Sequence, residues 1–330
     1  MLPSYVRTPE TAYVAQALVH KHNADQVLLT GWRRTSEDEF ALTARWPEQH
    51  SFYAVTDNLH DPLLLSETIR QTFPLLSHAA YDVPQGHPLL WEHYTYGIDR
   101  DALRAGGLPH TIDLRVIATE VDRRGARVTA LALAIDVFRG PMLLGTASTR
   151  FTIQTPAVYR RLRAERSDPD LIEPSAPGAP LPPTRVGRSA CRDVLLSPTQ
   201  TPRHHRLRFD TSHPYYFDHR VDHVPGMLLL EAARQAAQEA LFPLPVVAVG
   251  MDNQFHRYVE LDTPCDVEAK QLPSDEKGFT RVRVTMRQNG AEHYATTVTL
   301  APSPTPSRLP ATTRALPGRR PGRASRRRPA

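Results

Sequence analysis

The stretch Leu228-Leu229-Leu230-Glu231-Ala232-Ala233-Arg234-Gln235 decides how this chain of 330 residues is organised, because Leu63-Leu64-Leu65-Ser66-Glu67-Thr68-Ile69-Arg70-Gln71 carries the same pattern. Glu, Arg and Gln recur with a constant offset of 164 positions, and a leucine run precedes them in both copies. Self-similarity at one long period is typical of a duplicated unit, here of roughly 150 residues, which is an ordinary domain size. The chain is therefore predicted to contain two copies of one fold.

The first half is predicted to be one long helix set among strands. Asp61 and Pro62 form a helix start signal, a side-chain cap followed by proline at the first helical position, so the helix is expected from Pro62 to about His78. Pro74 lies inside that span and is expected to end the helix early or to kink it. Alternation of β-branched or aromatic residues with polar ones predicts strands at 26–32, 38–46, 89–98, 111–121, 127–137 and 142–154.

The second half repeats this order of elements. A helix is expected from Pro225-Gly226 to about Leu241, and strands are expected at 189–196, 204–210, 246–251, 263–272, 279–288 and 291–300. Each half is thus predicted to be α+β, with domains at 1–155 and 189–300. Residues 156–188 are rich in Pro and Arg and are predicted to be a linker, with a short surface helix at 159–166.

The last thirty residues carry the basic character of the chain. Residues 301–330 contain eight Arg, seven Pro and no acidic residue, with so little to bury that the segment is predicted to be disordered. Without these eight Arg, 32 basic residues stand against 35 acidic ones. The net charge of +5 and the pI of about 9.3 therefore do not indicate a nucleic-acid-binding body, and no helix-turn-helix pattern is found.

Cysteine use and hydropathy indicate a cytoplasmic protein. Only Cys191 and Cys265 are present, too few for a disulfide framework, and no CxxC or Cys/His cluster suggests a structural metal. The first 23 residues do not resemble a signal peptide, and no stretch approaches the ~20 apolar residues of a membrane span. Neither a cofactor nor a metal is predicted.

The repeated Glu, Arg and Gln share one helix face, since positions i, i+3 and i+4 lie together. As a single copy, a Glu–Arg pair is usually a solvated contact worth ~0.3–0.5 kcal/mol. Its recurrence in both halves, each time beside a leucine run, instead indicates buried chemistry. A buried Glu can act as base or acid, and an adjacent Arg can hold a phosphate or a carboxylate.

The segment before the second helix carries two histidines, His219 and His223, at the i, i+4 spacing of a helical zinc pair. Pro225-Gly226 interrupts a helix there and no third ligand is evident, so a metal site is not predicted. The alternative is that the segment's Asp and His side chains bond loop backbone and cap the helix.

This segment also carries a resemblance. Phe217 to Gln235 resembles the entry into the central helix of the hotdog fold, in which an antiparallel sheet wraps a long helix, and Pro225-Gly226 followed by Glu231 is similar to the pattern of hydroxyacyl-carrier-protein dehydratases. Phe217 stands where those dehydratases have their catalytic His, nine positions before the Gly, which argues against dehydration.

A closer resemblance, over about residues 20–300, is to the A-factor biosynthesis (AfsA-type) family, which makes precursors of γ-butyrolactone signals in quorum signalling. The motifs that match are His60-Asp61-Pro62-Leu63-Leu64, Glu67-Thr68-Ile69-Arg70-Gln71, Asp218-His219, Asp222-His223-Val224-Pro225-Gly226-Met227 and Leu230-Glu231-Ala232-Ala233-Arg234-Gln235. The resemblance implies a tandem hotdog acyltransferase that moves a β-ketoacyl group from acyl carrier protein to the hydroxyl of dihydroxyacetone phosphate. It further implies that Glu67, Arg70, Glu231 and Arg234 are catalytic.

Acyl transfer from a thioester to an alcohol needs a base, donors for the developing oxyanion and a cation for the phosphate. We expect Glu231 to be the base, Arg234 to hold the phosphate or the oxyanion, and the backbone N–H groups of Gly226 and Met227 to face the thioester carbonyl. Candidate substrate-binding residues are Gln71, Gln235, His223, Gly226 and Met227, with the alternative that the two glutamines are core amides. No Ser or Cys occupies a nucleophile elbow, so direct transfer is favoured over an acyl-enzyme.

Two other classes of function remain open from the sequence. A hotdog thioesterase, or an acyl-binding module without catalysis, would use the same cleft, and a thioesterase would release free acid without any triose phosphate. A DNA-binding regulator is suggested only by the Arg-rich tail, which offers nonspecific attraction to phosphate. Two hotdogs in one chain are also compatible with a monomer that contains its own hotdog pair, without a membrane or a specific nucleic acid as partner.

Overall fold

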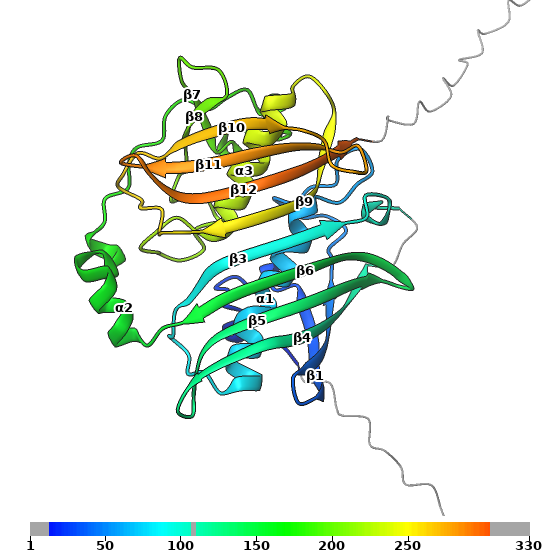
Figure 1. The fold of residues 1–330 in the computed structure, drawn as a ribbon, viewed down its shortest axis with the longest axis vertical. Helices are drawn as coiled ribbons and strands as arrows, with labels where there is room; N and C mark the ends of the chain where they lie inside the picture. Colours follow the sequence, from blue (N-terminus) through cyan, green and yellow to red (C-terminus); the bar gives the residue numbers. More distant parts are fainter. Residues whose placement is uncertain (1–12, 107–109, 304–330) are drawn as a thin grey trace, which may run out of the picture.

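The computed structural model describes residues 13–106 and 110–303, which form one curved antiparallel sheet around two helices (Figure 1). The first half supplies strands β1 Leu29–Ser36, β2 Glu39–Arg45, β3 Leu89–Ile98, β4 Thr111–Arg124, β5 Arg127–Arg139 and β6 Met142–Ile153. The second half supplies β7 Leu196–Pro198, β8 His204–Leu207, β9 Val246–Phe255, β10 Asp266–Leu272, β11 Thr280–Gln288 and β12 Ala291–Pro302. The strand order is β1-β2-β4-β5-β6-β3-β9-β12-β11-β10-β8-β7.

The two halves meet where β3 pairs with β9. Tyr94 lies opposite Asn253 and Gly97 opposite Gly250 in this ladder. The buried Asn253 amide donates to the Tyr94 carbonyl at 2.7 Å and accepts from the Tyr294 hydroxyl at 2.6 Å. The backbone ladder of β3 and β9 makes the junction continuous with the rest of the sheet, and the Asn253 side chain supports it.

The helices α1 (Pro62–Tyr81) and α3 (Gly226–Leu241) lie inside the curve of the sheet and contact each other (Figure 1). Seventeen of the twenty residues of α1 and thirteen of the sixteen of α3 are buried. A helix that is enclosed on all sides buries its polar residues along with its leucines, so each of those polar groups needs a partner. The predicted α+β architecture, a central helix wrapped by an antiparallel sheet in each half, is confirmed.

The start of α1 agrees with its sequence signal, but its end does not. Asp61 caps the helix by accepting from the Leu63 N–H at 2.9 Å. The helix continues past Pro74 to Tyr81, three residues beyond the expected His78, so an early end at Pro74 is wrong, while the alternative of a kink stays a prediction. Pro74 removes one helical hydrogen bond, and the burial of Leu75 and Leu76 in the turn that follows offsets this loss.

Three predicted strands begin too early: β10, which starts at Asp266 rather than at 263, and β1 and β7, which share one reason. Instead of strand, Ala24–Gln26 and Cys191–Asp193 form short 3₁₀ turns, so the strands start at Leu29 and Leu196 rather than at 26 and 189. In both places a glutamine side chain from a central helix binds the backbone just before the strand. That side chain takes the hydrogen bonds that a neighbouring strand would otherwise supply.

The segment predicted as a linker holds the helix α2 (Pro156–Arg163), which lies beside the sheet (Figure 1) and begins and ends three residues before the predicted 159–166. This helix is not merely on the surface, because Arg163 is buried. Further on, Pro183–Val186 forms a 3₁₀ turn packed against α3. The domain boundaries themselves stay a prediction.

The basic tail, apart from Ala301, Pro302 and Ser303, lies outside the described residues. Ala301 and Pro302 complete β12. Among the residues that the structure describes, no helix is both long and apolar enough to cross a bilayer.

Candidate active site

The first of two polar centres is built on α1 around Glu67, which is 1% exposed. Arg70 donates to both carboxylate oxygens through Nε, at 3.2 and 3.1 Å, and through Nη2 at 2.9 Å. Gln71 Nε2 donates to Oε1 at 2.9 Å, and Lys21 Nζ lies 3.2 Å from the same oxygen. The predicted triad therefore does converge on one carboxylate, with Lys21 as a fourth member.

The second centre, on α3 around the fully buried Glu231, has the same plan. Arg234 donates through Nε to Oε2 and through Nη2 to Oε1, both at 2.7 Å, and Gln235 Nε2 donates to Oε1 at 2.6 Å. Arg188 takes the place of Lys21, with its Nε 2.7 Å from Oε1. Its Nη1 also reaches Asp61, the cap of α1, at 2.9 Å, so this centre spans both halves.

Both glutamates are ionised at neutral pH. Burial on its own would raise the pKa of Glu67, but Arg70 and Lys21 outweigh it and lower that pKa to about 2. Burial likewise opposes ionisation of Glu231, and Arg188 with Arg234 lowers its pKa to about 2. Each carboxylate is thus a hydrogen-bond acceptor, and becomes a stronger base if its cations are drawn away.

Gln71 and Gln235 have a structural task that is the same in both halves. Gln71 donates to the Gln26 carbonyl at 2.8 Å and accepts from the Leu28 N–H at 2.9 Å. Gln235 donates to the Asp193 carbonyl at 2.8 Å and accepts from the Leu195 N–H at 2.8 Å. The glutamines tie each glutamate to the segment that carries its outer cation, and neither amide has a spare group for a substrate.

Lys21 and Arg188 are the site residues that sequence reasoning missed, and a second repeat could have found them. Residues 19–30 and 186–197 share Val-x-Lys/Arg followed by Val-Leu-Leu-Thr/Ser, with an offset of 167 positions. Arg70 and Arg234 donate to the carbonyls of Val19 (3.3 Å) and Val186 (3.0 Å) in these segments. This offset of 167 positions is three more than the 164 positions that separate the two helices, so a search at one fixed period does not find both repeats.

A buried aromatic cluster of Phe52, Tyr53, Tyr215 and Tyr216 touches both centres. Lys21 lies over the Tyr215 ring at 4.9 Å, and Arg188 over the Phe52 ring at 4.3 Å. The hydroxyls of all three tyrosines are buried; those of Tyr53 and Tyr215 interact with each other, and that of Tyr216 lacks a hydrogen-bond partner among the described residues. An unpaired buried hydroxyl is costly, so it marks a place where a polar ligand or water can bind.

The start of α3 is packed against the first half. A Cβ on Gly226 would come within 2.7 Å of the Trp91 ring on β3, so only glycine permits this approach. Met227 is 5% exposed, and Pro225 provides no side-chain cap. The N–H groups of Leu228 and Leu229 donate to the Pro225 carbonyl, and the expected role of the Gly226 and Met227 N–H groups at the thioester carbonyl stays a prediction.

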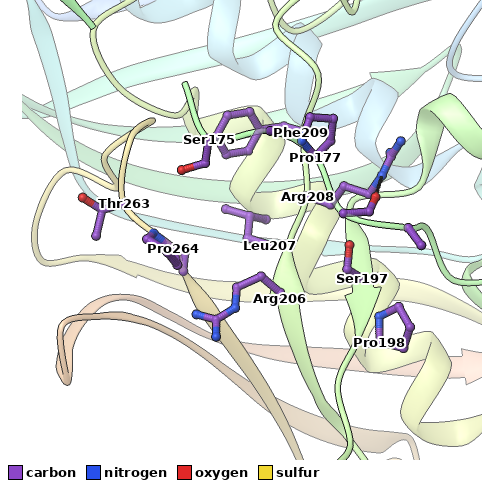
Figure 2. Close-up of a pocket in the computed structure, with 14 residues that line it drawn as sticks. Ser175, Pro177, Ser197, Pro198, Arg206, Leu207, Arg208, Phe209, Thr263 and Pro264 are labelled. Carbon is purple, nitrogen blue, oxygen red and sulfur yellow. Dashed lines mark hydrogen bonds between the residues drawn. The ribbon is translucent and has the colours of Figure 1, made fainter. Parts of the chain in front are cut away.

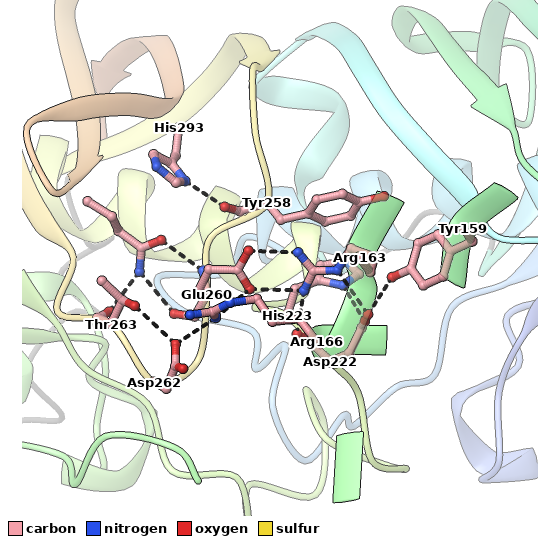
Figure 3. A network of polar contacts seen from close by, with 11 residues as sticks. Tyr159, Arg163, Arg166, Asp222, His223, Tyr258, Glu260, Asp262, Thr263 and His293 are labelled. Carbon is pink, nitrogen blue, oxygen red and sulfur yellow. Dashed lines mark hydrogen bonds and ion pairs between the residues drawn. The ribbon is translucent and has the colours of Figure 1, made fainter. Parts of the chain in front are cut away.

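His223 belongs to a different cluster, shown in Figure 3. Its Nδ1 lies 2.7 Å from Asp222, whose carboxylate also accepts from the Tyr159 hydroxyl at 2.6 Å and from Arg163 Nε at 3.2 Å. Arg163 forms two further bonds to Glu260, at 2.7 and 2.9 Å. This cluster fastens α2 to the second half, and no contact joins His223 to Glu231 in the described part of the chain.

Two cavities among the described residues are large enough for a substrate. The first, of about 450 Å³, lies at the edge of the second half between β8 and residues 175–178 (Figure 2). Its lining holds Arg206, Arg208 and Cys265 but no carboxylate and no residue of the Glu231 centre. The second, of about 680 Å³, is lined by Lys21 and so borders the Glu67 centre.

Two sheets fused through β3 and β9, each wrapped around a helix with a buried Glu–Arg–Gln centre, define a double-hotdog protein with two related polar centres. The chain belongs to the A-factor biosynthesis hotdog domain family, whose family model matches residues 5–155 and 172–303. The family and the fold expected from the sequence are thereby confirmed.

The chain is similar to curated proteins called 2-oxo-3-(phosphooxy)propyl 3-oxoalkanoate synthase. The protein from Streptomyces virginiae is 41% identical, over 84% of this chain and 94% of its own length. Those from Streptomyces coelicolor and Streptomyces griseus are 40% and 38% identical, over 86% and 84% of this chain and 90% and 92% of their own lengths. The predicted reaction matches the name that all three carry.

The chain also resembles solved structures, more distantly. The 12:0-ACP thioesterase from Umbellularia californica is 10% identical, with 82% of this chain and 99% of that one covered and a TM-score of 0.49. An acyl-ACP thioesterase from Bacteroides thetaiotaomicron is 10% identical, with 81% and 100% covered and a TM-score of 0.47. The hotdog assignment rests on the family match and on the strand order instead.

Proposed function

We propose that this protein transfers a 3-oxoacyl (β-ketoacyl) group from acyl carrier protein to the free hydroxyl of dihydroxyacetone phosphate. The identity of 41% with a 2-oxo-3-(phosphooxy)propyl 3-oxoalkanoate synthase over most of both chains carries this proposal. That name describes an ester of a 3-oxo acid with dihydroxyacetone phosphate, which is the product such a transfer would form.

The two Glu–Arg–Gln centres support the reaction chemically, and Glu67, Arg70, Glu231 and Arg234 are its candidate catalytic residues. A glutamate accepts the proton of the acceptor hydroxyl as its oxygen attacks the thioester carbonyl. The new C–O bond forms, the C–S bond breaks, and the proton passes to the departing thiolate. Because each carboxylate is held by cations that also suit a phosphate, binding of the acceptor would weaken their hold and strengthen the base.

A thioesterase is the second candidate, since the same base could activate water in place of the sugar hydroxyl. The four cationic side chains around the two glutamates favour the transferase, because only the transferase has a phosphate on its acceptor in addition to that of the pantetheine arm.

Mass spectrometry of the reaction separates these candidates. Purified protein is incubated with a 3-oxoacyl thioester of acyl carrier protein, with and without dihydroxyacetone phosphate. We expect a phosphorylated ester only when the triose phosphate is present. Release of free 3-oxo acid at the same rate in both mixtures would instead identify a thioesterase.

Acyl carrier protein as donor, a cytoplasmic location and a monomeric state are further parts of this proposal. Both cysteines are free, which suits a reducing compartment. The pairing of β3 with β9 gives each hotdog its partner within one chain, so a second copy is not needed to complete the sheet.

A further inference from the structure

The cavity of about 680 Å³ beside the Glu67 centre has an unusual lining. His20 and His22 enter it from the segment before β1, His87 from the loop after α1, and His219 from the second half. Lys21 also lines it and is hydrogen-bonded to the Glu67 carboxylate. Four imidazoles and an ammonium group around one space are suited to phosphate, since imidazole N–H groups donate hydrogen bonds and the ammonium group donates charge-assisted ones.

The histidines are held at the cavity in different ways. His22 and His219 stack with their ring centres 4.5 Å apart, and Asp218 bonds to both residues through the His22 N–H and His219 Nδ1. The His20 ring contacts His78 behind it at 2.8 Å between their Nε2 atoms. His87 Nδ1 is buried and unpartnered among the described residues, so it has hydrogen-bonding capacity for a ligand.

The charges immediately around the two glutamates differ. Glu67 faces two cations, Lys21 and Arg70, and so leaves one positive charge in excess within its centre. Glu231 also faces two cations, but Arg188 pairs with Asp61 as well, which makes that centre neutral. Asp218, which interacts electrostatically with Lys21 beside the cavity, offsets this excess, so the two centres differ in how their charges are paired rather than in their sum.

Arg70 and Arg234 differ in how many of their guanidinium nitrogens have a hydrogen-bond partner. Arg234 donates its remaining Nη1 to Gln238, one turn along α3, at 2.6 Å. At the corresponding position α1 has Pro74, and no partner for Nη1 of Arg70 is found among the described residues. The Arg70 side chain is 19% exposed, against 9% for Arg234.

The space beside the two centres also differs. The residue before Arg188 is Gly187, and a Cβ there would come within 2.6 Å of the Gln238 amide. The residue before Lys21 is His20, which lines the cavity. Gln238 thus fills, in the second half, the region that is open beside the first centre.

We propose that the four-histidine cavity binds the phosphate of the acceptor and that the Glu67 centre is the working one, while the Glu231 centre is closed and holds the two halves together. This inference rests on the proposed transferase function and goes further, because it names the cavity that holds the acceptor and the centre that supplies the base. The base is then Glu67, rather than the Glu231 favoured from the sequence.

A phosphate could reach this cavity from two sources. One is the phosphomonoester of the triose phosphate acceptor, and the other is the phosphate of the pantetheine arm that carries the acyl group. A 3-oxoacyl N-acetylcysteamine thioester has no phosphate, so a donor of this kind leaves the acceptor as the sole source. The assay is therefore run with this donor and with acyl carrier protein.

The test compares His87→Gln and His219→Gln with a matched control, His256→Gln. His256 lies in the second half, its side chain is 44% exposed, and it lines neither cavity. With either donor, both cavity variants should raise the KM for dihydroxyacetone phosphate ~10-fold or more, with the KM for the thioester unchanged. The control variant should behave as the wild type.

Direct binding of dihydroxyacetone phosphate, measured by calorimetry without any thioester, separates this inference from the proposed function. If both cavity variants bind dihydroxyacetone phosphate more weakly than the wild type, the subsite is supported, whether or not the wild type forms an ester. If the wild type forms no ester, the transferase function is wrong but the subsite is not. An active wild type whose KM for the acceptor is the same in all three variants overturns the subsite. A rise confined to the KM for acyl carrier protein also overturns it, since the cavity would then hold the pantetheine phosphate.

Discussion

The Glu67 and Glu231 centres share one plan, yet only one of them is open. In both, a helical Glu binds an Arg three residues later, a Gln four residues later and a cation from the segment before the first strand. Around Glu231 the three guanidinium nitrogens of Arg234 are all hydrogen-bonded and Nη2 of Arg188 is buried without a partner among the described residues, whereas the Glu67 centre borders a cavity.

The comparison shows how little separates a buried ion cluster from a binding site. Replacement of Gln238 by Pro74, and of Arg188 by the shorter Lys21, removes two contacts that the second centre makes. The backbone clamps formed by Gln71 and Gln235 are the same in both halves. The fold therefore keeps both clusters in place, and the surrounding residues, Pro74 and Lys21 in one half and Gln238 and Arg188 in the other, determine whether a ligand can enter.

The largest expected effect is on catalysis. Glu67→Gln keeps the size of the side chain and deletes its charge, so kcat for ester formation should fall by ~10²–10⁴. Glu231→Gln should lower kcat far less in protein that is still folded. The measurement is single-turnover formation of the phosphorylated ester at saturating substrates, and a greater loss in Glu231→Gln would move the working centre to the second half.

Stability should respond in the opposite order. Glu231→Gln leaves Arg188 and Arg234 buried without their shared carboxylate, which should cost ~3–5 kcal/mol of unfolding free energy. Glu67→Gln should cost less, because the Arg70 side chain is 19% exposed and can be partly solvated. Urea unfolding at pH 7 measures both, and equal losses would mean that the centres are equally closed.

Replacing Pro74, one turn after Arg70, with the Gln found at the same position after Arg234 should change the accessibility of the first centre. Pro74→Gln places an amide where Gln238 stands in α3 and should occupy Nη1 of Arg70. The KM for dihydroxyacetone phosphate should then rise ~2–10-fold, as one competing hydrogen bond allows, while thermal stability is maintained or increased. Pro74→Ala is the control, since it restores the backbone N–H without an amide, and it should leave this KM unchanged.

A smaller effect concerns acid stability. Burial, with His78 and Arg70, lowers the pKa of His20 from 6.5 to about 4. The unfolded chain therefore takes up this proton first, and the stability that neutral His20 contributes is lost as the pH falls from about 6.5 to about 4. His20→Gly copies Gly187 and fits the left-handed backbone at φ 52°.

The variant should consequently lose less unfolding free energy than the wild type between pH 7 and pH 5. His60, whose pKa is also lowered to about 4, by burial and by Arg139, keeps part of this dependence in both proteins. Below about pH 4.5 the two glutamates, with pKa values near 2, add a second loss that the variant shares. Parallel curves from pH 7 to pH 5 would show that His20 does not contribute.

The sequence predicted the helices and their shared triad well, because caps and i, i+3, i+4 spacing are local signals. Asp61 caps α1, and Glu67, Arg70 and Gln71 meet on one face as expected. The starts of β1 and β7 could not be read this way, since long-range bonds from Gln71 and Gln235 hold the preceding backbone out of the sheet. Local propensity contains no information about such bonds.

The outer members of the site were hidden for a similar reason. Lys21 is 46 positions before Glu67, and Arg188 is 43 positions before Glu231, inside a segment whose composition suggested a linker. Only the fold brings these cations to the carboxylates, at 3.2 and 2.7 Å. The difference between an open and a closed centre likewise depends on packing, which a motif repeated in both halves does not show.

The continuous strand pairing of β3 with β9 has an evolutionary consequence. In a two-fold homodimer every substitution occurs twice, so both centres must keep the same chemistry. Here the two halves are covalently joined and encoded separately, and a change such as Pro74 alters one centre while the other keeps Gln238. The fused chain can thus specialise one half for chemistry and the other for structural integrity.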